Sequence, residues 1–270
     1  MRLSFEKVQG LGNDFLLVDS RSGGELVTPD EARLLCDRHL GVGADGVLTL
    51  LPPRDGRSRA RLHIYNPDGS VAEMCGNGLR CAAARLLAEA AGPFCVDTDA
   101  GPLRCDDGGA GAVVTEIGRP RLGEPETIEA AGRRVEGIAV SLGNPHFVVF
   151  AQAGEADEAT ARTLGPAIER HPRFAPRRTN VELCAVRPEG LGLVDWERGA
   201  GLTLACGTGA AAAAAAACAK GIARPGDEIR IDLPGGRLWA TVAQNLASVS
   251  LRGPAAAVFH GEIELPEKGP

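Results

Sequence analysis

The sequence predicts an α/β protein of two pseudo-symmetric halves, each rich in strands and organised around one central helix. One observation is a repeat: Met-Cys-Gly-Asn-Gly around Cys75 and Ala-Cys-Gly-Thr-Gly around Cys206 both precede alanine-rich, helix-forming stretches. A second is that Leu-Gly-Asn13 and Leu-Gly-Asn144 are separated by the same number of residues as the two cysteines. A third is the length, because 270 residues suit two domains of about 100–150 residues each. Halves that fold alike and face each other would form one cleft with a thiol on each wall.

The domain boundary is expected where glycine and proline cluster, between Gly118 and Pro125. We expect residues 1–118 to form a first domain that carries Cys75 and is completed by about residues 257–270. Residues 119–256 are expected to form the second domain, which carries Cys206.

Composition narrows the class of protein. The chain is 44% hydrophobic and 24% charged with a net charge of −6, and its basic residues form no block, which argues against nucleic acid as a partner. The longest apolar run, residues 210–219, is about half of the ~20 residues that a membrane helix needs. The first residues alternate as a strand does and resemble no secretory signal. We therefore expect a cytoplasmic protein, in which the eight cysteines remain thiols.

In the first half, alternating apolar residues predict strands on either side of a tight turn that holds Asn13. Thr28-Pro-Asp-Glu31 has the residues of a capping box, so a helix is expected from Pro29 to about His39. The first cysteine helix should run from about Gly76 to Ala91 and end at Gly92-Pro93. Further strands are expected near residues 47–51, 61–66, 94–98, 103–105 and 113–117.

In the second half, a surface helix is expected over residues 155–170, because its acidic first turn complements the helix dipole. The helix from about Gly207 to Lys220 is apolar all round, which predicts that it is buried. Strands are expected near residues 133–140, 147–150, 181–186 and 191–197, on both sides of Pro234-Gly-Gly236, and at 248–251 and 258–265.

The position of each cysteine points to chemistry. A thiol in the first turn of a helix meets unpaired backbone N–H groups and the positive end of the helix dipole, and both favour the thiolate. Such a thiol can titrate at about 3.5–7.5 instead of near 8.5, so we expect both thiols to be reactive at neutral pH. The glycines at 76, 78, 207 and 209 would let a substrate approach the backbone.

Two such thiols on opposite walls of a cleft suit inversion at an amino-acid α-carbon, because one can remove the proton and the other can return one from the far face. Helix N-termini could stabilise the charge that develops on the α-carboxylate. A pyridoxal phosphate enzyme needs a Schiff-base lysine, and the three lysines, Lys7, Lys220 and Lys268, lie away from the cysteine motifs. The sequence therefore favours a mechanism without a cofactor.

These motifs together resemble the diaminopimelate epimerase family. The resemblance rests on Gly10-Leu-Gly-Asn-Asp-Phe, Asn66-Pro-Asp-Gly-Ser, the two cysteine motifs, Gly143-Asn-Pro-His, Thr179-Asn180 and Trp196-Glu-Arg-Gly, which span nearly the whole chain. It implies a cytoplasmic homodimer that interconverts LL- and meso-diaminopimelate, without a cofactor or a metal, for lysine and peptidoglycan synthesis. It also implies a barrel-like sheet around a central helix in each domain, with the active site in the cleft between domains.

The resemblance also assigns roles to residues. It implies that Cys75 and Cys206 are the two acid/base residues and that Gly76, Asn77, Gly207 and Thr208 bind the reacting α-carboxylate and its surroundings. It implies that the distal end of the substrate is bound by Asn66, Asn180, Glu197 and Arg198. Asn13 and Asn144 are expected to line the cleft, and His146 is a possible supporting residue.

Two alternatives remain open. The first is a related cofactor-independent racemase: a proline-type enzyme is disfavoured by Asn77, whereas a histidine racemase would differ mainly in the distal pocket. The second is a non-catalytic amino-acid-binding protein, which would not need two thiols in glycine-rich turns. Solvent exchange at the α-carbon of diaminopimelate, compared with that of histidine, separates these alternatives.

Overall fold

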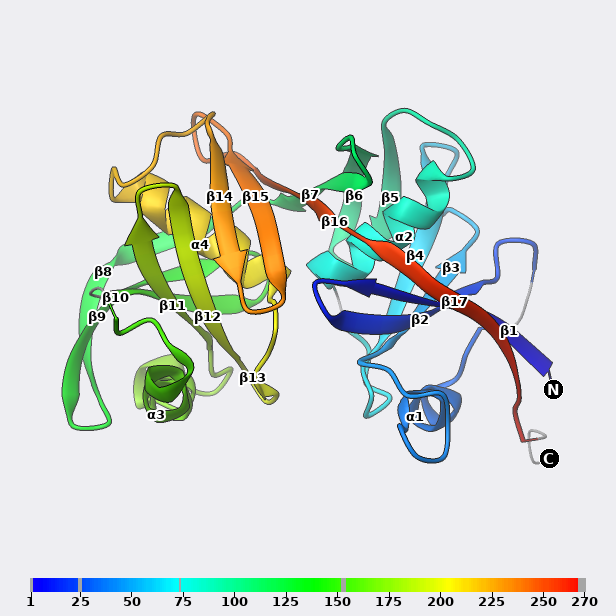
Figure 1. The fold of residues 1–270 in the computed structure, drawn as a ribbon, viewed down its shortest axis with the longest axis horizontal. Helices are drawn as coiled ribbons and strands as arrows, with labels where there is room; N and C mark the ends of the chain where they lie inside the picture. Colours follow the sequence, from blue (N-terminus) through cyan, green and yellow to red (C-terminus); the bar gives the residue numbers. More distant parts are fainter. Residues whose placement is uncertain (1, 24–25, 73, 152–153, 267–270) are drawn as a thin grey trace. The chain divides into compact units, whose positions relative to one another are not determined.

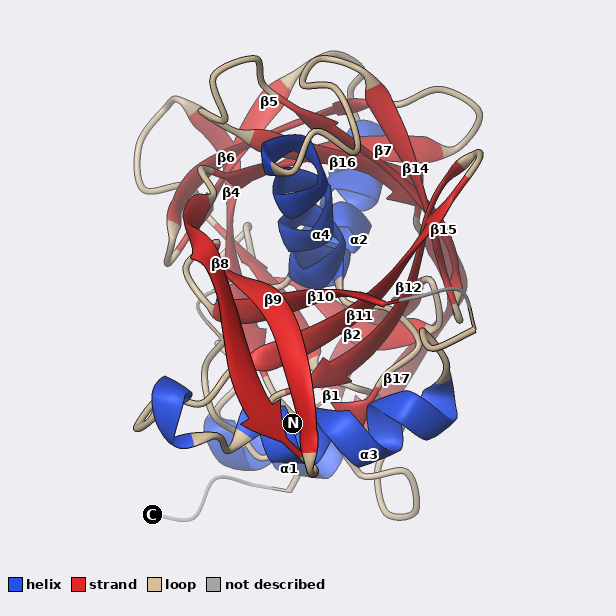
Figure 2. Ribbon diagram, turned by 90° about the vertical axis from the view of Figure 1, so that its left-hand side faces the viewer, coloured by secondary structure: helices blue, strands red, loops and turns tan. Residues whose placement is uncertain are grey.

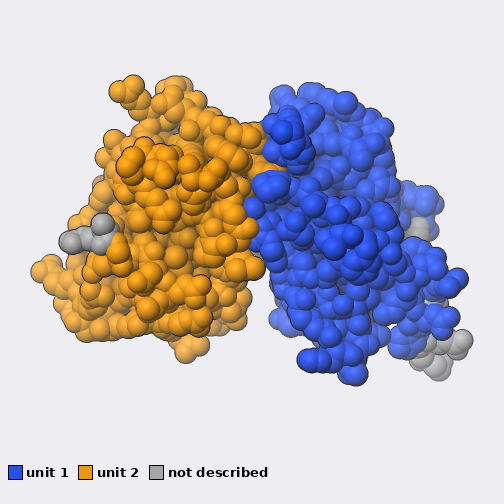
Figure 3. All heavy atoms as spheres, viewed as in Figure 1, with its two compact units in different colours: residues 1–115, 254–270 blue, residues 116–253 orange. Residues whose placement is uncertain are grey.

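The computed structural model describes residues 2–23, 26–72, 74–151 and 154–266 (Figure 1). The chain divides into two compact units, residues 1–115 with 254–270, and residues 116–253 (Figure 3). The two-unit, strand-rich α/β fold expected from the sequence is confirmed. The proposed domain limits at residues 118 and 257 lie within three residues of the limits of these compact units.

Unit 1 is a ladder of eight strands joined by hydrogen bonds. Its order is β17 (Ala256–Glu264), β1 (Arg2–Gly10), β2 (Asn13–Asp19), β3 (Val47–Leu51), β4 (Ser58–Tyr65), β5 (Phe94–Thr98), β6 (Gly101–Asp107) and β7 (Ala112–Gly118). The pairs β2–β3 and β4–β5 are parallel and the others antiparallel. Parallel neighbours need a crossover, and the two crossovers hold α1 (Pro29–Cys36) and α2 (Gly76–Leu87).

Unit 2 repeats this ladder. Its order is β8 (Arg121–Ala130), β9 (Arg133–Ser141), β10 (Pro145–Ala151), β11 (Asn180–Arg187), β12 (Gly190–Glu197), β14 (Glu228–Leu233), β15 (Gly236–Val242) and β16 (Val249–Pro254). The parallel pairs β10–β11 and β12–β14 occupy the same two places, with α3 (Glu158–Glu169) and α4 (Gly207–Ala219) in the crossovers. This shared order supports the duplication inferred from the sequence. Two short elements, η1 (Pro172–Phe174) and β13 (Gly201–Leu202), complete the unit.

Each sheet packs against two helices, one on each of its faces. In unit 1, Phe15 and Leu17 of β2 face the cluster that includes α2, whereas Leu16 and Val18 face the cluster that includes α1. In unit 2, α4 packs against β9, β10, β11 and β15 (Figure 2), while α3 joins a cluster with Phe147. Alternating residues of one strand therefore build two cores.

The helix α4 is buried on all sides, as the sequence predicted. All alanines from 210 to 217 have no exposed surface. Alanine has the highest helix propensity and brings no polar atom, so it suits a helix surrounded by a sheet.

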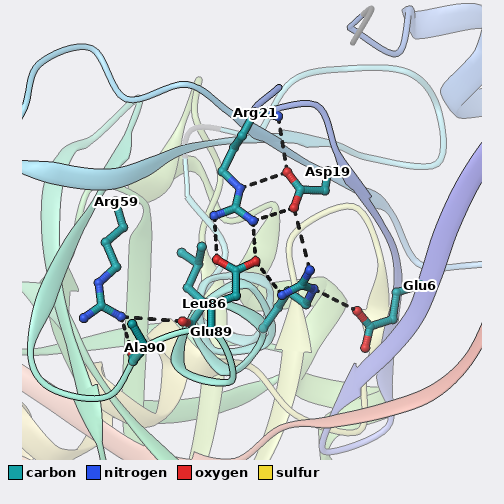
Figure 4. A network of polar contacts seen from close by, with 8 residues as sticks. Glu6, Asp19, Arg21, Arg59, Leu86, Glu89 and Ala90 are labelled. Atoms are coloured by element: carbon teal, nitrogen blue, oxygen red, sulfur yellow. Dashed lines mark hydrogen bonds and ion pairs between the residues drawn. The ribbon is translucent and has the colours of Figure 1, made fainter. Parts of the chain in front are cut away.

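Ion pairs on its exposed side, as well as the buried Leu86, anchor the C-terminal end of α2 (Figure 4). Arg21 bonds both Asp19 of β2 and Glu89, which follows the helix. Arg85 bonds Glu89 at 2.6 Å and lies 3.6 Å from Glu6 of β1. These contacts tie the helix to two strands and so help to fix where its other end, at Cys75, lies.

Three details of the sequence reading were wrong. The helix α1 ends at Cys36 instead of near His39, because the Asp37 side chain accepts the N–H groups of His39 and Leu40. The helix α2 ends at Leu87 rather than at Ala91. The strand β8 was missed, because Pro125 lies within it, at an irregularity in its pairing with β9 where a missing N–H is tolerated.

Candidate active site

Cys75 is the N-cap residue of α2. Its backbone is extended, with φ −137° and ψ 117°, and its sulfur accepts the N–H of Gly78 at 3.4 Å. A Cβ atom on Gly78 would lie 2.9 Å from Leu48 Cδ2, so a larger residue would force either Leu48 or this turn to shift. The thiol therefore takes the place that Ser or Asp usually holds at a helix start.

One side-chain amide lies near the Cys75 sulfur and is hydrogen-bonded to a second. Asn13, at the start of β2, has its Oδ1 3.9 Å from Cys75 Sγ, and the same oxygen accepts a hydrogen bond of 3.3 Å from Asn77 Nδ2. Asn13 Nδ2 in turn donates to Asp45 Oδ2 at 3.0 Å. Unit 1 thus brings together three of the residues that the sequence predicted for the site.

Arg80 is a residue of this group that the sequence reading missed. It has no exposed surface and donates to Asn77 Oδ1 at 2.8 Å and to Pro254 O at 2.9 Å. Burial lowers the pKa of its guanidinium, while the Cys81 and Cys75 thiols raise it. The available signal was an arginine one helical turn after Asn77, within the N-terminal half of a helix whose other charged residue is Arg85.

Cys206 occupies the equivalent position in unit 2, as the N-cap of α4. Its sulfur accepts the N–H of Gly209 at 3.3 Å and lies 3.5 Å from Thr208 Oγ1. Its own N–H donates to Asp195 Oδ2 at 3.1 Å. Only 5% of Cys206 is exposed, whereas Cys75 is partly exposed.

A series of hydrogen-bonded side chains extends from Cys206 through Thr208. Asn144 Nδ2 donates to Thr208 Oγ1 at 3.0 Å, and Asn144 Oδ1 lies 3.0 Å from His146 Nε2. His146 Nδ1 is 2.6 Å from Glu182 Oε1, and neither of these two side chains has exposed surface. Unit 2 therefore brings Asn144, Thr208 and His146 together with Cys206, as predicted, and adds Glu182.

The expectation of a lowered thiol pKa is wrong for Cys206. Burial raises the pKa of this thiol well above its usual value, and the carboxylates of Glu197, Asp195 and Glu182 raise it further. The Thr208 hydroxyl lowers it, but this contribution is smaller. Sequence alone showed the helix start but not the three acidic side chains that strands bring beside it. The surroundings of Cys206 therefore favour the neutral thiol over the thiolate.

The residues predicted for the distal end of the substrate form a second group in unit 2. Asn180 Oδ1 accepts the backbone N–H of Arg198 at 2.8 Å, and its Nδ2 donates to Pro145 O at 3.0 Å. Glu197 Oε1 accepts from Thr203 Oγ1 at 2.6 Å. Burial raises the pKa of the Glu197 carboxyl, while its hydrogen bonds with Thr203 and Cys206 lower it. Glu197 thus connects this group to the thiol.

Asn66 lies in unit 1, and its side-chain hydrogen bond does not lead to Cys75. It lies in the turn after β4, where its Nδ2 donates to Ser70 Oγ at 3.0 Å. Gly76 and Gly207 are the first residues of α2 and α4, where backbone N–H groups have no partner within the helix. They are placed to present N–H groups to an anion.

The described residues offer little that would hold a metal. In the described ranges, no group of three or more His, Cys, Asp or Glu side chains is arranged to hold a metal ion. Lys7 is paired with Asp14, and Lys220 with Glu136 at 3.0 Å, while Lys268 lies outside the described residues.

No helix in the described part of the chain is both long and apolar enough to cross a bilayer.

Solved structures of epimerases and racemases have this fold. A predicted epimerase from Pseudomonas aeruginosa covers 98% of this chain and all of its own, with a TM-score of 0.74 and 18% identity. A hydroxyproline epimerase from Agrobacterium vitis, with bound trans-4-hydroxy-L-proline, has a TM-score of 0.73 and 16% identity, over 97% of this chain and 92% of its own. At such low identity these matches define only the class of fold, which is shared by epimerases and racemases with two similar halves.

Sequence comparison defines the family within this class. The sequence model described as "Diaminopimelate epimerase" matches residues 5–123 and 138–258. A diaminopimelate epimerase from Thermosynechococcus vestitus is 44% identical over 97% of this chain and all of its own, and one from Alkalilimnicola ehrlichii is 41% identical over 98% and 100%. The chain belongs to the diaminopimelate epimerase family, a family of isomerases. The resemblance inferred from the motifs is confirmed.

Proposed function

We propose that this chain catalyses the interconversion of LL- and meso-diaminopimelate with Cys75 and Cys206 as two acid/base residues. The observation that carries the proposal is the equivalent placement of the two thiols. Each is the N-cap of a helix and accepts an N–H from the glycine three residues later. An asparagine lies near each thiol: Asn13, the first residue of β2, is 3.9 Å from the Cys75 sulfur, and Asn144, the residue before β10, donates to Thr208 beside Cys206. Family membership supports the substrate.

The proposed reaction needs a base on one face of the α-carbon and an acid on the other. One sulfur, as thiolate, removes the α-proton, and the other, as thiol, donates a proton to the opposite face of the planar carbanion. Cys206 suits the donor role in the substrate-free protein, because burial raises the pKa of its thiol. In the reverse direction the roles exchange. The two sulfurs are proposed to act on opposite faces of one substrate.

The carbanion needs stabilisation, because an α-proton is weakly acidic. N–H groups at the first turns of α2 and α4, at Gly76, Asn77, Gly207 and Thr208, are proposed to bind the α-carboxylate. Preorganised donors of this kind typically contribute about 3–4 kcal/mol each to a transition state. The reaction is proposed to proceed without a cofactor, since the thiols and the helix N-termini supply the acid, the base and the positive potential.

The second amino-acid centre of the substrate is proposed to bind Asn66, Asn180, Glu197 and Arg198. A zwitterionic centre needs a cation, an anion and neutral amides, and Glu197-Arg198 supplies both charges in adjacent positions. Asn180 fixes the backbone of Arg198 through the 2.8 Å bond to its N–H. This pocket would give specificity for a substrate with two amino-acid ends.

We also propose a cytoplasmic homodimer that supplies lysine and peptidoglycan precursors. All eight cysteines are free thiols, which suits a reducing compartment. The strand β17 exposes two large apolar side chains, Val258 at 57% and Phe259 at 46%, which a second copy could cover. Sedimentation velocity on the wild-type protein and a Phe259→Asp variant tests the dimer, since the variant should sediment as a monomer.

The activity is tested with reduced wild-type protein on diaminopimelate, histidine and proline, with solvent deuterium exchange at the α-carbon as the readout. We expect exchange and inversion with diaminopimelate. Turnover of histidine alone would instead assign a histidine racemase, and binding of an amino acid without exchange would assign a binding protein. Cys75→Ala and Cys206→Ala should each abolish inversion, because positioned acid/base groups typically contribute about 10²–10⁴-fold to rate and inversion needs both.

A further inference from the structure

Two acidic side chains lie directly behind Cys206, and the proposed mechanism gives them no role. Glu182 of β11 and Asp195 of β12 are direct partners in this antiparallel pair, so their side chains leave the sheet on the same face. Their exposed fractions are 0% and 1%. Both point to the start of α4, because a Cβ atom on Gly209 would lie 3.0 Å from Glu182 Oε1 and 3.1 Å from Asp195 Oδ1. Gly209 therefore leaves room for both carboxyl groups.

Each carboxyl group uses one oxygen and leaves the other without a partner. Glu182 Oε1 lies 2.6 Å from His146 Nδ1, and Asp195 Oδ2 accepts the Cys206 N–H at 3.1 Å. Among the described residues, Glu182 Oε2 and Asp195 Oδ1 are buried and have no hydrogen-bond partner. Two unsatisfied acceptors in one buried region are costly. One proton on the pair reduces this cost, because it leaves one negative charge instead of two and converts one of the free acceptors into a donor.

We propose that Glu182 and Asp195 share one proton in the native protein, that Asp195 carries it, and that the neutral Asp195 positions the Cys206 backbone. Two carboxylates within ~6 Å of each other in a buried site do not both ionise readily. The geometry assigns the proton to Asp195, because one oxygen of Glu182 is already paired with a ring nitrogen of His146, whereas Asp195 accepts the Cys206 N–H with Oδ2 and keeps Oδ1 for the proton.

The other groups around the pair agree with this assignment. His146 faces it from β10, Glu197 from β12, Cys184 from β11 and Cys206 from α4. Burial raises the pKa of the Asp195 carboxyl well above its usual value, and the charges of Glu182 and Glu197 raise it further. The bond from the Cys206 N–H lowers it, but by less.

The effect of a neutral Asp195 on the charge of Cys206 during the reaction rests on the proposed function. In one direction of the reaction Cys206 must become a thiolate, and an ionised Asp195 beside it would oppose that charge. A neutral Asp195 holds the Cys206 N–H without adding a second negative charge. Asp195 is thus a positioning residue, which acts on the reaction through the backbone and the potential at Cys206.

The first test measures the protonation of Asp195 in the folded protein and does not depend on enzyme activity. An acid whose pKa is raised by folding stabilises the native state fully below its unfolded pKa of about 3.9 and loses that contribution as the pH rises towards its folded pKa. Urea unfolding is therefore followed from pH 5 to pH 8 for wild type and Asp195→Asn. The folding equilibrium constant of wild type should fall about tenfold per pH unit relative to the variant. The infrared band of a protonated carboxyl group should disappear in the variant.

Two further variants make this test decisive. Asp232→Asn is the control: although burial raises the pKa of Asp232, hydrogen bonds from Arg237 and Arg230 lower it, so any difference from wild type should lie below pH 5. Glu182→Gln removes the other member of the pair and should also reduce the pH slope. Equal slopes for wild type, Asp195→Asn and Glu182→Gln, with no carboxyl band lost, would overturn the proposal.

The second test measures catalysis on the same variants. Asparagine can accept the Cys206 N–H and donate towards Glu182, so Asp195→Asn should keep kcat for diaminopimelate within about threefold of wild type at neutral pH. Asp195→Ala removes the acceptor and should lower kcat at least about tenfold with little change in KM. A wild-type protein without epimerase activity, but with the expected pH slope, would refute the proposed function and leave the proton-sharing pair intact. An Asp195→Asn variant as inactive as Asp195→Ala would refute the positioning role.

Discussion

Replacement of Gly165 by alanine should destabilise the protein, although the same change stabilises most helices. Gly165 lies inside α3, where alanine usually gains about 0.8–1.0 kcal/mol over glycine. Here the new Cβ would lie 2.4, 2.5 and 2.7 Å from Cγ, Cδ2 and Cβ of Trp196. Carbon atoms in contact prefer about 3.5–4.0 Å, so the indole must move by about 1 Å.

The expected magnitude follows from what Trp196 would lose. Overpacking of a core typically costs about 1–3 kcal/mol. Trp196 Nε1 donates to the Glu169 carboxylate at 2.8 Å, and a hydrogen bond to a charged group contributes about 1.5–3 kcal/mol. After subtraction of the helix-propensity gain, Gly165→Ala should lower the free energy of unfolding by about 2–4 kcal/mol. Because Trp196 precedes Glu197 and Arg198, KM for the substrate should also rise.

Urea unfolding followed by tryptophan fluorescence measures the effect. Gly56→Ala is the control, because a Cβ there meets no atom within 4 Å and its φ is not positive. That variant should be unchanged or more stable by about 0.4–1 kcal/mol. A Gly165→Ala protein that is as stable as wild type or more stable would refute the reasoning that the indole blocks this position.

Three further changes test other parts of the structure. Thr28→Ala removes the side chain that caps α1 and should lower the free energy of unfolding by about 1 kcal/mol, measured by urea unfolding. Hydrogen bonds from Arg21 lower the pKa of Asp19, so the ionised carboxylate stabilises the folded protein above its unfolded pKa, and this stabilisation is lost as the pH falls. When the free energy of unfolding is measured against pH, that of Asp19→Asn should therefore decrease less than that of wild type between about pH 5 and pH 2. Asn180→Ala removes the acceptor of the Arg198 N–H and should raise KM by about tenfold with a smaller change in kcat, measured by steady-state kinetics.

Local signals in the sequence predicted much of the fold. The capping residues of α1, the buried character of α4 and the repeated cysteine turns are each encoded within a few residues, and all are present in the structure. The two strand ladders follow the same order, which a repeat of two motifs at one shared separation already indicated. Patterns of this kind need no knowledge of distant contacts.

Properties that depend on distant residues were not predictable in the same way. Arg80 supports Asn77 only because Pro254, far along the chain, returns to accept its Nε–H. Glu182 and Asp195 read as ordinary strand residues until the pairing of β11 with β12 places both at α4. The raised pKa of Cys206 follows from this tertiary arrangement, which overrides the local effect of the helix start.

The central claim is that two thiols, one from each unit, act on opposite faces of one α-carbon. The most direct test is to run the reaction from LL-diaminopimelate in deuterium oxide and to follow both isomers at early times by NMR. Two bases predict that the meso product carries solvent deuterium at the inverted carbon from the first turnovers, while the remaining LL substrate keeps its protium. A product that retains the substrate's own hydrogen would contradict the account.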